Sequence, residues 1–244
     1  MRFLTPDLLL TIHRIMRLFT LGARLETAAS FIPEGAAVAD IGTDHARLPI
    51  WLVKTGRCSH VIASDVADTP VQRARDNVER WGVAEAIQIV QCAGFDSIAP
   101  GSFTHAVICG MGGDTISSIL MAAPWTADAP YTLILQAETA ARRLREFLYT
   151  HGYTICQEIA VLDGGRVYSV IEARGGLDPH RSDPLYARIS APLLRQHDSA
   201  ARLYAARVKK SLMREMQGMQ QCSEPYRNAE ALLERILEWE TENG

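Results

Sequence analysis

Short apolar runs alternate along the chain with amphipathic stretches whose apolar positions recur every three to four residues. The runs have the length of buried strands, and the stretches between them have helical periodicity. Strands buried on both faces and alternating with helices are typical of a parallel sheet covered by helices on both sides. We therefore predict a doubly wound α/β sheet with strands at residues 36–41, 60–64, 87–91, 106–109 and 132–135, and helices at residues 68–81, 115–122 and 139–151.

The last two strand-like runs are connected differently. Residues 158–162 and 167–173 are largely apolar and are joined by Asp163-Gly164-Gly165-Arg166. A Gly-Gly pair between two such runs is typical of a tight β-hairpin turn. The sheet is therefore predicted to end in an antiparallel hairpin.

Helices are predicted at both ends of the chain. One begins at Thr5 and Pro6 and ends at Gly22, and a second covers residues 23–32. After a Gly- and Pro-containing linker at residues 174–180, a long helix opens at Ser190 and Pro192 and runs to about residue 221. Pro225 separates it from a last helix at residues 226–240. We expect a Rossmann-like domain over residues 1–176 and an α-helical hairpin domain over residues 181–244.

The composition indicates the class of protein and the cellular compartment to expect. The 244 residues are 48% hydrophobic and 22% charged, as in a soluble globular protein. The most apolar stretch, residues 8–21, is interrupted by His13, Arg14 and Arg17, so it predicts no membrane span. Asp7 precedes it where a secretory signal would carry positive charge, and the stretch lacks a small-residue cleavage site, so it does not predict secretion. Five cysteines without a C-x-x-C pair are typical of reduced thiols. We expect a cytoplasmic protein, monomeric or weakly dimeric, with no membrane or metal partner.

The turn after the first predicted strand holds acidic side chains and a single glycine. It reads Asp40-Ile41-Gly42-Thr43-Asp44-His45 and lacks the G-x-G-x-x-G pattern that wraps a pyrophosphate. An acidic turn suits a ligand with positive charge and no phosphate, such as S-adenosylmethionine. Asp65, 23 residues after Gly42, lies where an acidic side chain would accept from ribose hydroxyls. Capping of the next helix by Asp40 or Asp44 is the alternative. With the terminal hairpin, the turn favours a class I methyltransferase over a dehydrogenase.

A glycine-rich segment follows the fourth predicted strand. It reads Cys109-Gly110-Met111-Gly112-Gly113-Asp114 and is predicted to be a loop at the same edge of the sheet. Glycines there would let the backbone approach a planar group closely. The alternative is an ordinary tight turn with Met111 in the core.

Four segments carry a family resemblance. They are Arg24-Leu25-Glu26 to Ile32-Pro33, the run Ala-Asp-Ile-Gly-Thr-Asp-His-Ala-Arg-Leu-Pro-Ile at residues 39–50, Gly110-Met111-Gly112-Gly113, and Leu133-Ile134-Leu135-Gln136. They resemble TrmK, the bacterial family of tRNA adenine-N1-methyltransferases that modify adenine 22 in the D arm. The resemblance covers nearly the whole chain, including the C-terminal helical hairpin, and the motif D-I-G-[ST]-D-H-A-x-L-P is specific to that family.

The resemblance implies S-adenosyl-L-methionine as cofactor and tRNA as partner. The implied cofactor-binding residues are Glu26, Asp40, Gly42, Thr43, Asp44, His45, Asp65, Val66, Ala93, Gly94 and Gly110. The implied reaction site holds Asp44, Met111 and Gly112.

Two departures from the family pattern concern this site. Residues 92–94 are Cys-Ala-Gly where the family usually has Gly-Asp-Gly, so Ala93 replaces an acidic residue near the cofactor adenine. Residues 136–138 are Gln-Ala-Glu where the family has Gln-Pro-Asn, so Glu138 replaces an amide. These departures leave open a non-catalytic or retargeted RNA-binding relative, while an oxidoreductase is disfavoured by the missing glycine pattern.

Methylation at adenine N1 makes few demands on ionisable groups. N1 already presents a lone pair, so the reaction needs positioning more than deprotonation. A carboxylate would stabilise the positive charge that develops on the base, and Asp44 is the candidate. His45 is expected to shape the turn, with action as a general base as the less favoured alternative.

Basic residues recur every seven positions near the C-terminus, at Arg181, Arg188, Arg195, Arg202 and Lys209. On one helix this spacing drifts by only about 20° per step. We predict that Arg195, Arg202 and Lys209 share the helix after Pro192 and bind RNA phosphates. The alternative is a solvated face whose charge is absorbed by ion pairs with the Glu-rich last helix.

Overall fold

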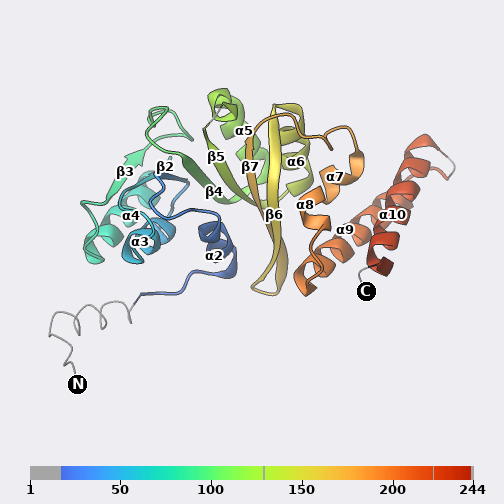
Figure 1. Ribbon diagram of the computed structural model, residues 1–244, viewed down its shortest axis with the longest axis horizontal. Helices are drawn as coiled ribbons and strands as arrows, with labels where there is room; N and C mark the ends of the chain where they lie inside the picture. Colours follow the sequence, from blue (N-terminus) through green and yellow to red (C-terminus); the bar gives the residue numbers. More distant parts are fainter. Residues whose placement is uncertain (1–17, 129, 222, 243–244) are drawn as a thin grey trace, which may run out of the picture. The chain divides into compact units, whose positions relative to one another are not determined.

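The computed structural model describes residues 18–128, 130–221 and 223–242 (Figure 1). The chain divides into two compact units, Met1–Ile108 and Cys109–Gly244. The seven strands form one sheet in the order β3-β2-β1-β4-β5-β7-β6. This arrangement confirms the predicted α/β fold. The helix expected from Thr5 falls largely on residues 1–17, outside the described residues.

The first unit has the alternating order expected from its apolar runs. Its elements are α2 (Ala23–Ser30), β1 (Val38–Ile41), α3 (Arg47–Lys54), β2 (Val61–Asp65), α4 (Asp68–Arg80), β3 (Ile87–Gln91) and the start of β4 (His105–Gly112). β1 pairs in parallel with β2 and β4, and β2 pairs in parallel with β3. All four residues of β1 are buried, Asp40 included. The register sets Ile41 beside Ser64, so the turn after β1 lies next to the end of β2.

The second unit continues the sheet and ends with helices. Its elements are α5 (Gly113–Ala122), the 3₁₀ turn η1 (Pro124–Ala127), β5 (Thr132–Thr139), α6 (Ala141–Thr150), β6 (Tyr153–Asp163), β7 (Arg166–Gly175), α7 (Pro184–Arg188), α8 (Ala191–Leu194), α9 (Ser199–Gln217) and α10 (Glu224–Glu242). β7 is antiparallel to both β5 and β6. Gly164 and Gly165 both have positive φ, of 56° and 76°, which a tight hairpin turn of this type requires. The predicted antiparallel hairpin is therefore confirmed.

The single long helix predicted from Ser190 to about residue 221 is wrong. α8 ends at Leu194, and α9 starts again at Ser199, where the Asp198 side chain accepts from the Ala201 N–H at 2.8 Å. An N-cap of this kind begins a helix, so the chain turns between the two segments. Pro225 does not precede the last helix but is its second residue, because the first turn of a helix does not need the missing N–H.

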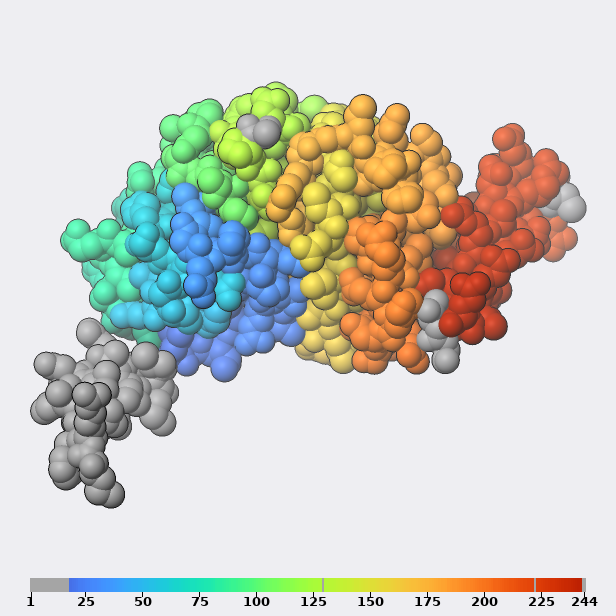
Figure 2. Space-filling model, in the orientation of Figure 1, coloured from blue at the N-terminus to red at the C-terminus, as the bar shows by residue number. Residues whose placement is uncertain are grey.

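The C-terminal helices pack on the hairpin through one apolar cluster. Tyr204, Leu212 and Ile236 are at most 1% exposed and lie in the same cluster as Ala160 of β6 and Val167 of β7. In Figure 2 the orange surface of the helices after residue 180 lies against the yellow surface of this hairpin. The division at residues 176 and 181 into a methyltransferase domain and a helical domain stays a prediction about function.

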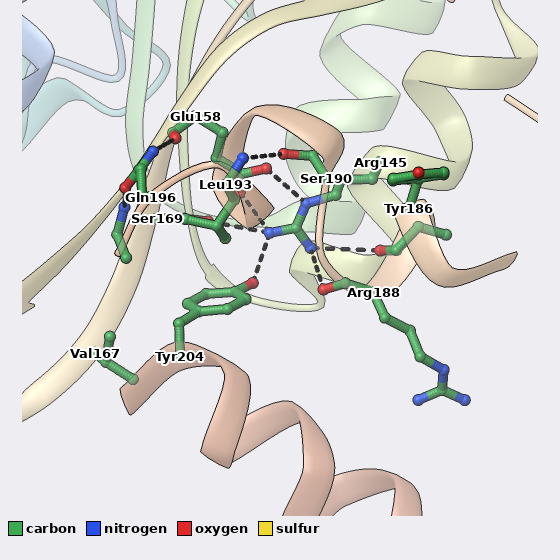
Figure 3. A network of polar contacts seen from close by, with 12 residues as sticks. Arg145, Glu158, Val167, Ser169, Tyr186, Arg188, Ser190, Leu193, Gln196 and Tyr204 are labelled. Carbon is green, nitrogen blue, oxygen red and sulfur yellow. Dashed lines mark hydrogen bonds and ion pairs between the residues drawn. The ribbon is translucent and has the colours of Figure 1, made fainter. Parts of the chain in front are cut away.

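A buried arginine fastens this packing (Figure 3). Arg145 of α6 is fully buried and pairs with Glu158 of β6, and it donates to Tyr204 Oη of α9 at 2.6 Å. It also donates to Ser169 Oγ of β7 at 3.2 Å and to the carbonyl oxygen of Arg188 at 3.1 Å. One side chain thus joins three helices and two strands.

No helix in the described ranges is both long and apolar enough to cross a membrane. In the same ranges, no three or more His, Cys, Asp or Glu residues are grouped closely enough to hold a metal ion.

Candidate functional site

The turn after β1 has an unusual backbone. Gly42, Asp44 and Ala46 have positive φ values of 77°, 47° and 53°, and only the first is a glycine. The N–H groups of Gly42 and Thr43 both donate to the carbonyl oxygen of Ser64, each at 2.8 Å. The turn is therefore fixed to the end of β2, and strained conformations at non-glycine residues are typical of functional sites.

Asp40 lies beneath this turn. Its side chain is 6% exposed, and Thr43 Oγ1 donates to its Oδ2 at 2.6 Å. Burial raises the pKa of Asp40 to about 6, although the Thr43 hydrogen bond lowers it and nearby Asp65 raises it. The alternative role as a helix cap is wrong for Asp40 and Asp44, because α3 has Ala46 at its N-cap with no side-chain hydrogen bond. Asp40 instead holds the turn from below.

This raised pKa predicts a pH-dependent stability. The folded state binds the Asp40 proton more tightly than the unfolded state, so the free energy of unfolding falls as pH rises from about 4 to about 6. Asp40→Asn removes this titration and keeps an acceptor for Thr43. We expect the variant to gain up to about 3 kcal/mol relative to the wild type between pH 4 and pH 7.5, measured by urea unfolding. Glu79→Gln, an exposed change, serves as control, and a difference that does not vary with pH would contradict the prediction.

Asp65 closes β2 beside the same turn. Its Oδ2 accepts from the Asp44 N–H at 3.3 Å, and its Oδ1 accepts from the Ala67 N–H at 3.2 Å. Each carboxylate oxygen has two lone pairs, so both can accept further hydrogen bonds. Val66, the next residue, is 65% exposed, which makes an apolar surface directly beside the carboxylate.

The loop after β3 lies at the same edge of the sheet. The register places Gln91 opposite Asp65, and the Cys92 N–H donates to the Asp65 carbonyl oxygen at 3.0 Å. Gly94 has a positive φ of 54°, and the chain turns there so that the Asp96 N–H reaches the Ala93 carbonyl oxygen. The first unit thus brings together Asp44, Asp65 and Ala93, as the parallel-sheet prediction requires.

Glu26 is less closely tied to this group. It lies exposed in the first turn of α2, and its side chain makes no hydrogen bond to the turn among the described residues. Its place in the site stays a prediction.

The Asp44 and His45 side chains lie side by side at the surface. The Asp44 side chain is 57% exposed, with His45 Nε2 at 3.3 Å from Oδ2 and Arg73 Nη1 at 4.0 Å from Oδ1. The His45 carbonyl oxygen accepts from Asn77 Nδ2 at 3.0 Å, which fixes the backbone of the turn to α4. This backbone contact fits the expected role of His45 in shaping the turn.

In the second unit, the glycine-rich segment is not the predicted loop. β4 continues through Gly112, and Gly113 begins α5 directly. Met111 is only half-buried and is not a core residue. The Gly110 N–H, at a residue with φ of 81°, donates to Gln136 Oε1 at 3.0 Å.

Gln136 lies at the centre of this part of the second unit. It is 1% exposed, and among the described residues its Nε2 has no hydrogen-bond partner, which is costly for a buried amide. The prediction that β5 ends at residue 135 and that α6 starts at residue 139 is wrong here, because β5 extends to Thr139 and α6 starts at Ala141. Gln136 therefore lies within the strand.

A close backbone approach explains the glycines. A Cβ at Gly113 would lie 2.5 Å from the Ala140 carbonyl oxygen, and one at Gly112 would lie 3.2 Å from Thr139 Oγ1. Only glycine lets the end of β4 pack this tightly against the end of β5.

The structure separates the three predicted RNA-binding residues. Arg195 is the C-cap of α8, whereas Arg202 and Lys209 lie on α9. Arg202 donates to the His197 carbonyl oxygen at 3.0 Å, and Lys209 pairs with Glu240 of α10. The prediction that they share one helix is wrong. For Lys209 the structure shows the alternative arrangement, an ion pair with the acidic last helix.

A family model described as "Methyltransferase domain" matches residues 21–171. That is more than half of the chain, so the protein belongs to the methyltransferase-domain family.

One curated relative is similar to a large part of this chain. The tRNA (adenine(22)-N(1))-methyltransferase of Bacillus subtilis (strain 168) is 37% identical over 156 residues, which are 64% of this chain and 66% of the relative. The match therefore spans just under two thirds of that relative's length. The TrmK resemblance inferred from the motifs is confirmed.

Solved structures extend the resemblance to the C-terminal helices. The crystal structure of the B. subtilis m1A22 tRNA methyltransferase TrmK has 27% identity and a TM-score of 0.77, covering 92% of this chain and 99% of its own. Streptococcus pneumoniae Sp1610, crystallised in complex with S-adenosyl-L-methionine, has 28% identity and a TM-score of 0.75, covering 88% of this chain and 97% of its own. The class I methyltransferase fold is confirmed.

Proposed function

We propose that the protein transfers a methyl group from S-adenosyl-L-methionine to N1 of adenine 22 in tRNA. The observation that carries the proposal is the acidic turn after β1, fixed to the end of β2 and placed beside Asp65 and Val66. The named relatives with the same fold support the choice of RNA substrate. Such an enzyme would work in the cytoplasm, as a monomer or weak dimer.

The residues of the turn fit the cofactor. Asp65 keeps free lone pairs for two ribose hydroxyls, and exposed Val66 offers an apolar surface to a planar base. Ala93 lacks a carboxylate, so the loop after β3 would contribute backbone groups around Gly94. The proposed binding set is Glu26, Asp40, Gly42, Thr43, Asp44, His45, Asp65, Val66, Ala93, Gly94 and Gly110. The bound cofactor would supply a methyl group activated by a sulfonium charge.

The chain's own groups would act mainly by positioning and by charge. Adenine N1 lies on the Watson–Crick edge, so the base must leave its stack before it can react. Asp44 would then stabilise the positive charge that develops on the base. Met111 and Gly112, at the end of β4, would border the base, and the unpartnered Gln136 Nε2 is a donor buried beside Gly110.

Methyl transfer to an unmodified tRNA transcript tests the proposal. Digestion of the product and analysis of its nucleosides should show 1-methyladenosine, and a transcript with guanine at position 22 should stay unmodified. If the protein binds S-adenosylhomocysteine but methylates no tRNA, the RNA substrate is wrong. If it binds neither the methyl donor nor its product, the assignment of the turn is wrong.

Asp65→Ala should weaken cofactor binding. Loss of a charge-assisted pair of hydrogen bonds to the ribose costs about 1.5 to 3 kcal/mol, or roughly tenfold to 150-fold in affinity. Calorimetry with S-adenosylhomocysteine measures the effect. Asp65 also holds the Asp44 and Ala67 backbone N–H groups, so Asp65→Asn, which keeps an acceptor, should lose less. Unchanged affinity in Asp65→Ala would remove this residue from the site.

A further inference from the structure

The second unit contains a concave, strongly basic pocket that borders the end of β5. Its volume is about 430 Å³, and residues of α6, α7 and α9 and the segment after Gln136 line it. Six cationic side chains and two carboxylates face it, namely Arg142, Arg145, Arg188, Arg207, Lys210 and Arg214 with Glu138 and Glu215. The pocket therefore carries a large excess of positive charge.

Part of this charge is neutralised within the protein. Arg145 is paired with Glu158, and Arg188 grips Glu215 with two hydrogen bonds of 3.1 Å and 2.7 Å. Arg142 lies 3.6 Å from Glu215 and also pairs with Glu146. Hydrogen bonding and charge from Arg188 hold the pKa of Glu215 below its usual value, so this acid stays ionised and committed to its partners.

The other three cationic side chains of the pocket lie on α9. Arg207, Lys210 and Arg214 are three and four residues apart in turn, which places them on one face of the helix. All three are exposed, and no carboxylate of the described residues is within 4.0 Å of Lys210 or Arg214. Arg207 is held in place, because it donates to the Val167 carbonyl oxygen at 2.7 Å and lies over the Tyr204 ring at 4.6 Å.

The position of the pocket links it to the candidate reaction site. Residues 137–142, which follow Gln136 directly, form one side of the pocket. Gln136 itself bonds to Gly110 at the end of β4. An anion in the pocket would therefore lie beside the segment that follows Gln136, and Gln136 is hydrogen-bonded to the end of β4 that is proposed to border the base.

We infer that this pocket binds phosphates of the RNA backbone, with Lys210 and Arg214 as direct contacts and Arg207 as a fixed third donor. The inference rests on the proposed function and assigns the RNA contact to a different set of basic residues from the seven-residue repeat. Guanidinium and ammonium groups are the usual protein partners of phosphate oxygens, and their contribution depends on salt. The pocket would hold the strand while the target base is turned out.

Binding of an unmodified tRNA transcript at several salt concentrations tests the inference. Lys210→Glu/Arg214→Glu should weaken binding at least about tenfold at 0.1 M salt and reduce the salt slope by about 2, one for each phosphate contact. Affinity for S-adenosylhomocysteine should not change. Lys210→Ala/Arg214→Ala removes the two charges without reversing them, and it should weaken tRNA binding in the same way but by less. Agreement between the two variants would show that the loss in the charge-reversed variant does not come from misfolding.

Arg75→Glu/Arg80→Glu is the matched comparison, because it reverses two exposed charges of α4, outside the pocket. It should weaken tRNA binding by less than about threefold, through screened long-range charge alone. The inference is overturned if the pocket variant keeps the wild-type affinity and salt slope, or if the comparison variant loses as much. In those cases wild-type methyl transfer still supports the proposed function. If wild-type protein neither binds nor methylates the transcript, both proposals fail together.

Discussion

Replacing Arg145 with methionine should lower the free energy of unfolding by about 3 to 5 kcal/mol, because it leaves a buried carboxylate without its cation. Glu158 is fully buried, and Arg145 supplies two of its hydrogen bonds. The same change removes the donor to Ser169 Oγ and the donor to Tyr204 Oη. Burial lowers the pKa of Arg145, but Glu158 and Tyr204 raise it by more, so the guanidinium stays charged. Urea unfolding followed by circular dichroism measures the loss.

The double variant Arg145→Met/Glu158→Met shows whether the stability is lost because Glu158 is left without a cation or because the ion pair itself is missing. Apolar replacement of both partners often recovers much of the stability, since the cost comes mainly from the orphaned charge. The single variant should also lose less at pH 5 than at pH 8, because a buried carboxylate without a partner can take up a proton at low pH. A single variant as stable as the wild type would show that the pair is dispensable.

The parallel part of the fold could be predicted closely because its pattern is local. The strand predicted at residues 87–91 has the bounds of β3, and the helix predicted at residues 68–81 matches α4 within one residue. The hairpin was also predictable, since Gly164 and Gly165 supply the positive φ values that its turn needs. Each of these signals lies within a few residues of the element that it specifies.

The errors arise where a residue's role depends on distant parts of the chain. α3 was not predicted, because Leu48-Pro49-Ile50-Trp51-Leu52-Val53 is as apolar as a strand and proline is acceptable only in the first helical turn. β6 starts at Tyr153, five residues before the predicted strand, and Arg145 and Glu158 have charges that are typical of the surface. Only the tertiary structure shows that they satisfy each other.

The sequence predicted the edge of the sheet at which the candidate site lies, but not the role of each residue in it. Asp44 and Asp65 were expected together, and the structure joins them through the Asp44 N–H. Asp40, in contrast, is buried and accepts a hydrogen bond from Thr43, and the sequence alone did not show that this carboxylate is buried. The prediction that Arg195, Arg202 and Lys209 lie on one face depended on a single unbroken helix. That helix is interrupted, because Asp198 is the N-cap of a new helix, α9. A signal for the restart was present in Asp198-Ser199, since both residues are favoured at helix caps.

Asp44→Asn should slow methyl transfer to tRNA by about 10²- to 10³-fold while changing cofactor affinity only slightly. The range is the usual cost of losing one group that stabilises charge in the transition state. Asn is the suitable replacement, because it has the size of Asp and tolerates the positive φ of 47° at this position. The Asp44 N–H can still donate to Asp65, so the turn should keep its shape.

Single-turnover methyl transfer and calorimetry with S-adenosylhomocysteine measure the two quantities separately. Asp76→Asn, an exposed change on α4 in the same unit, removes the same charge and controls for long-range electrostatics. If affinity and rate fall in parallel, Asp44 is a cofactor ligand only. If neither falls, the charge on the methylated base is stabilised elsewhere, and Glu138, which stands in place of the family's amide, becomes the next carboxylate to test. A selective loss of rate would assign Asp44 to the developing charge on adenine, because a group that acts only in the transition state changes the rate without changing ground-state binding.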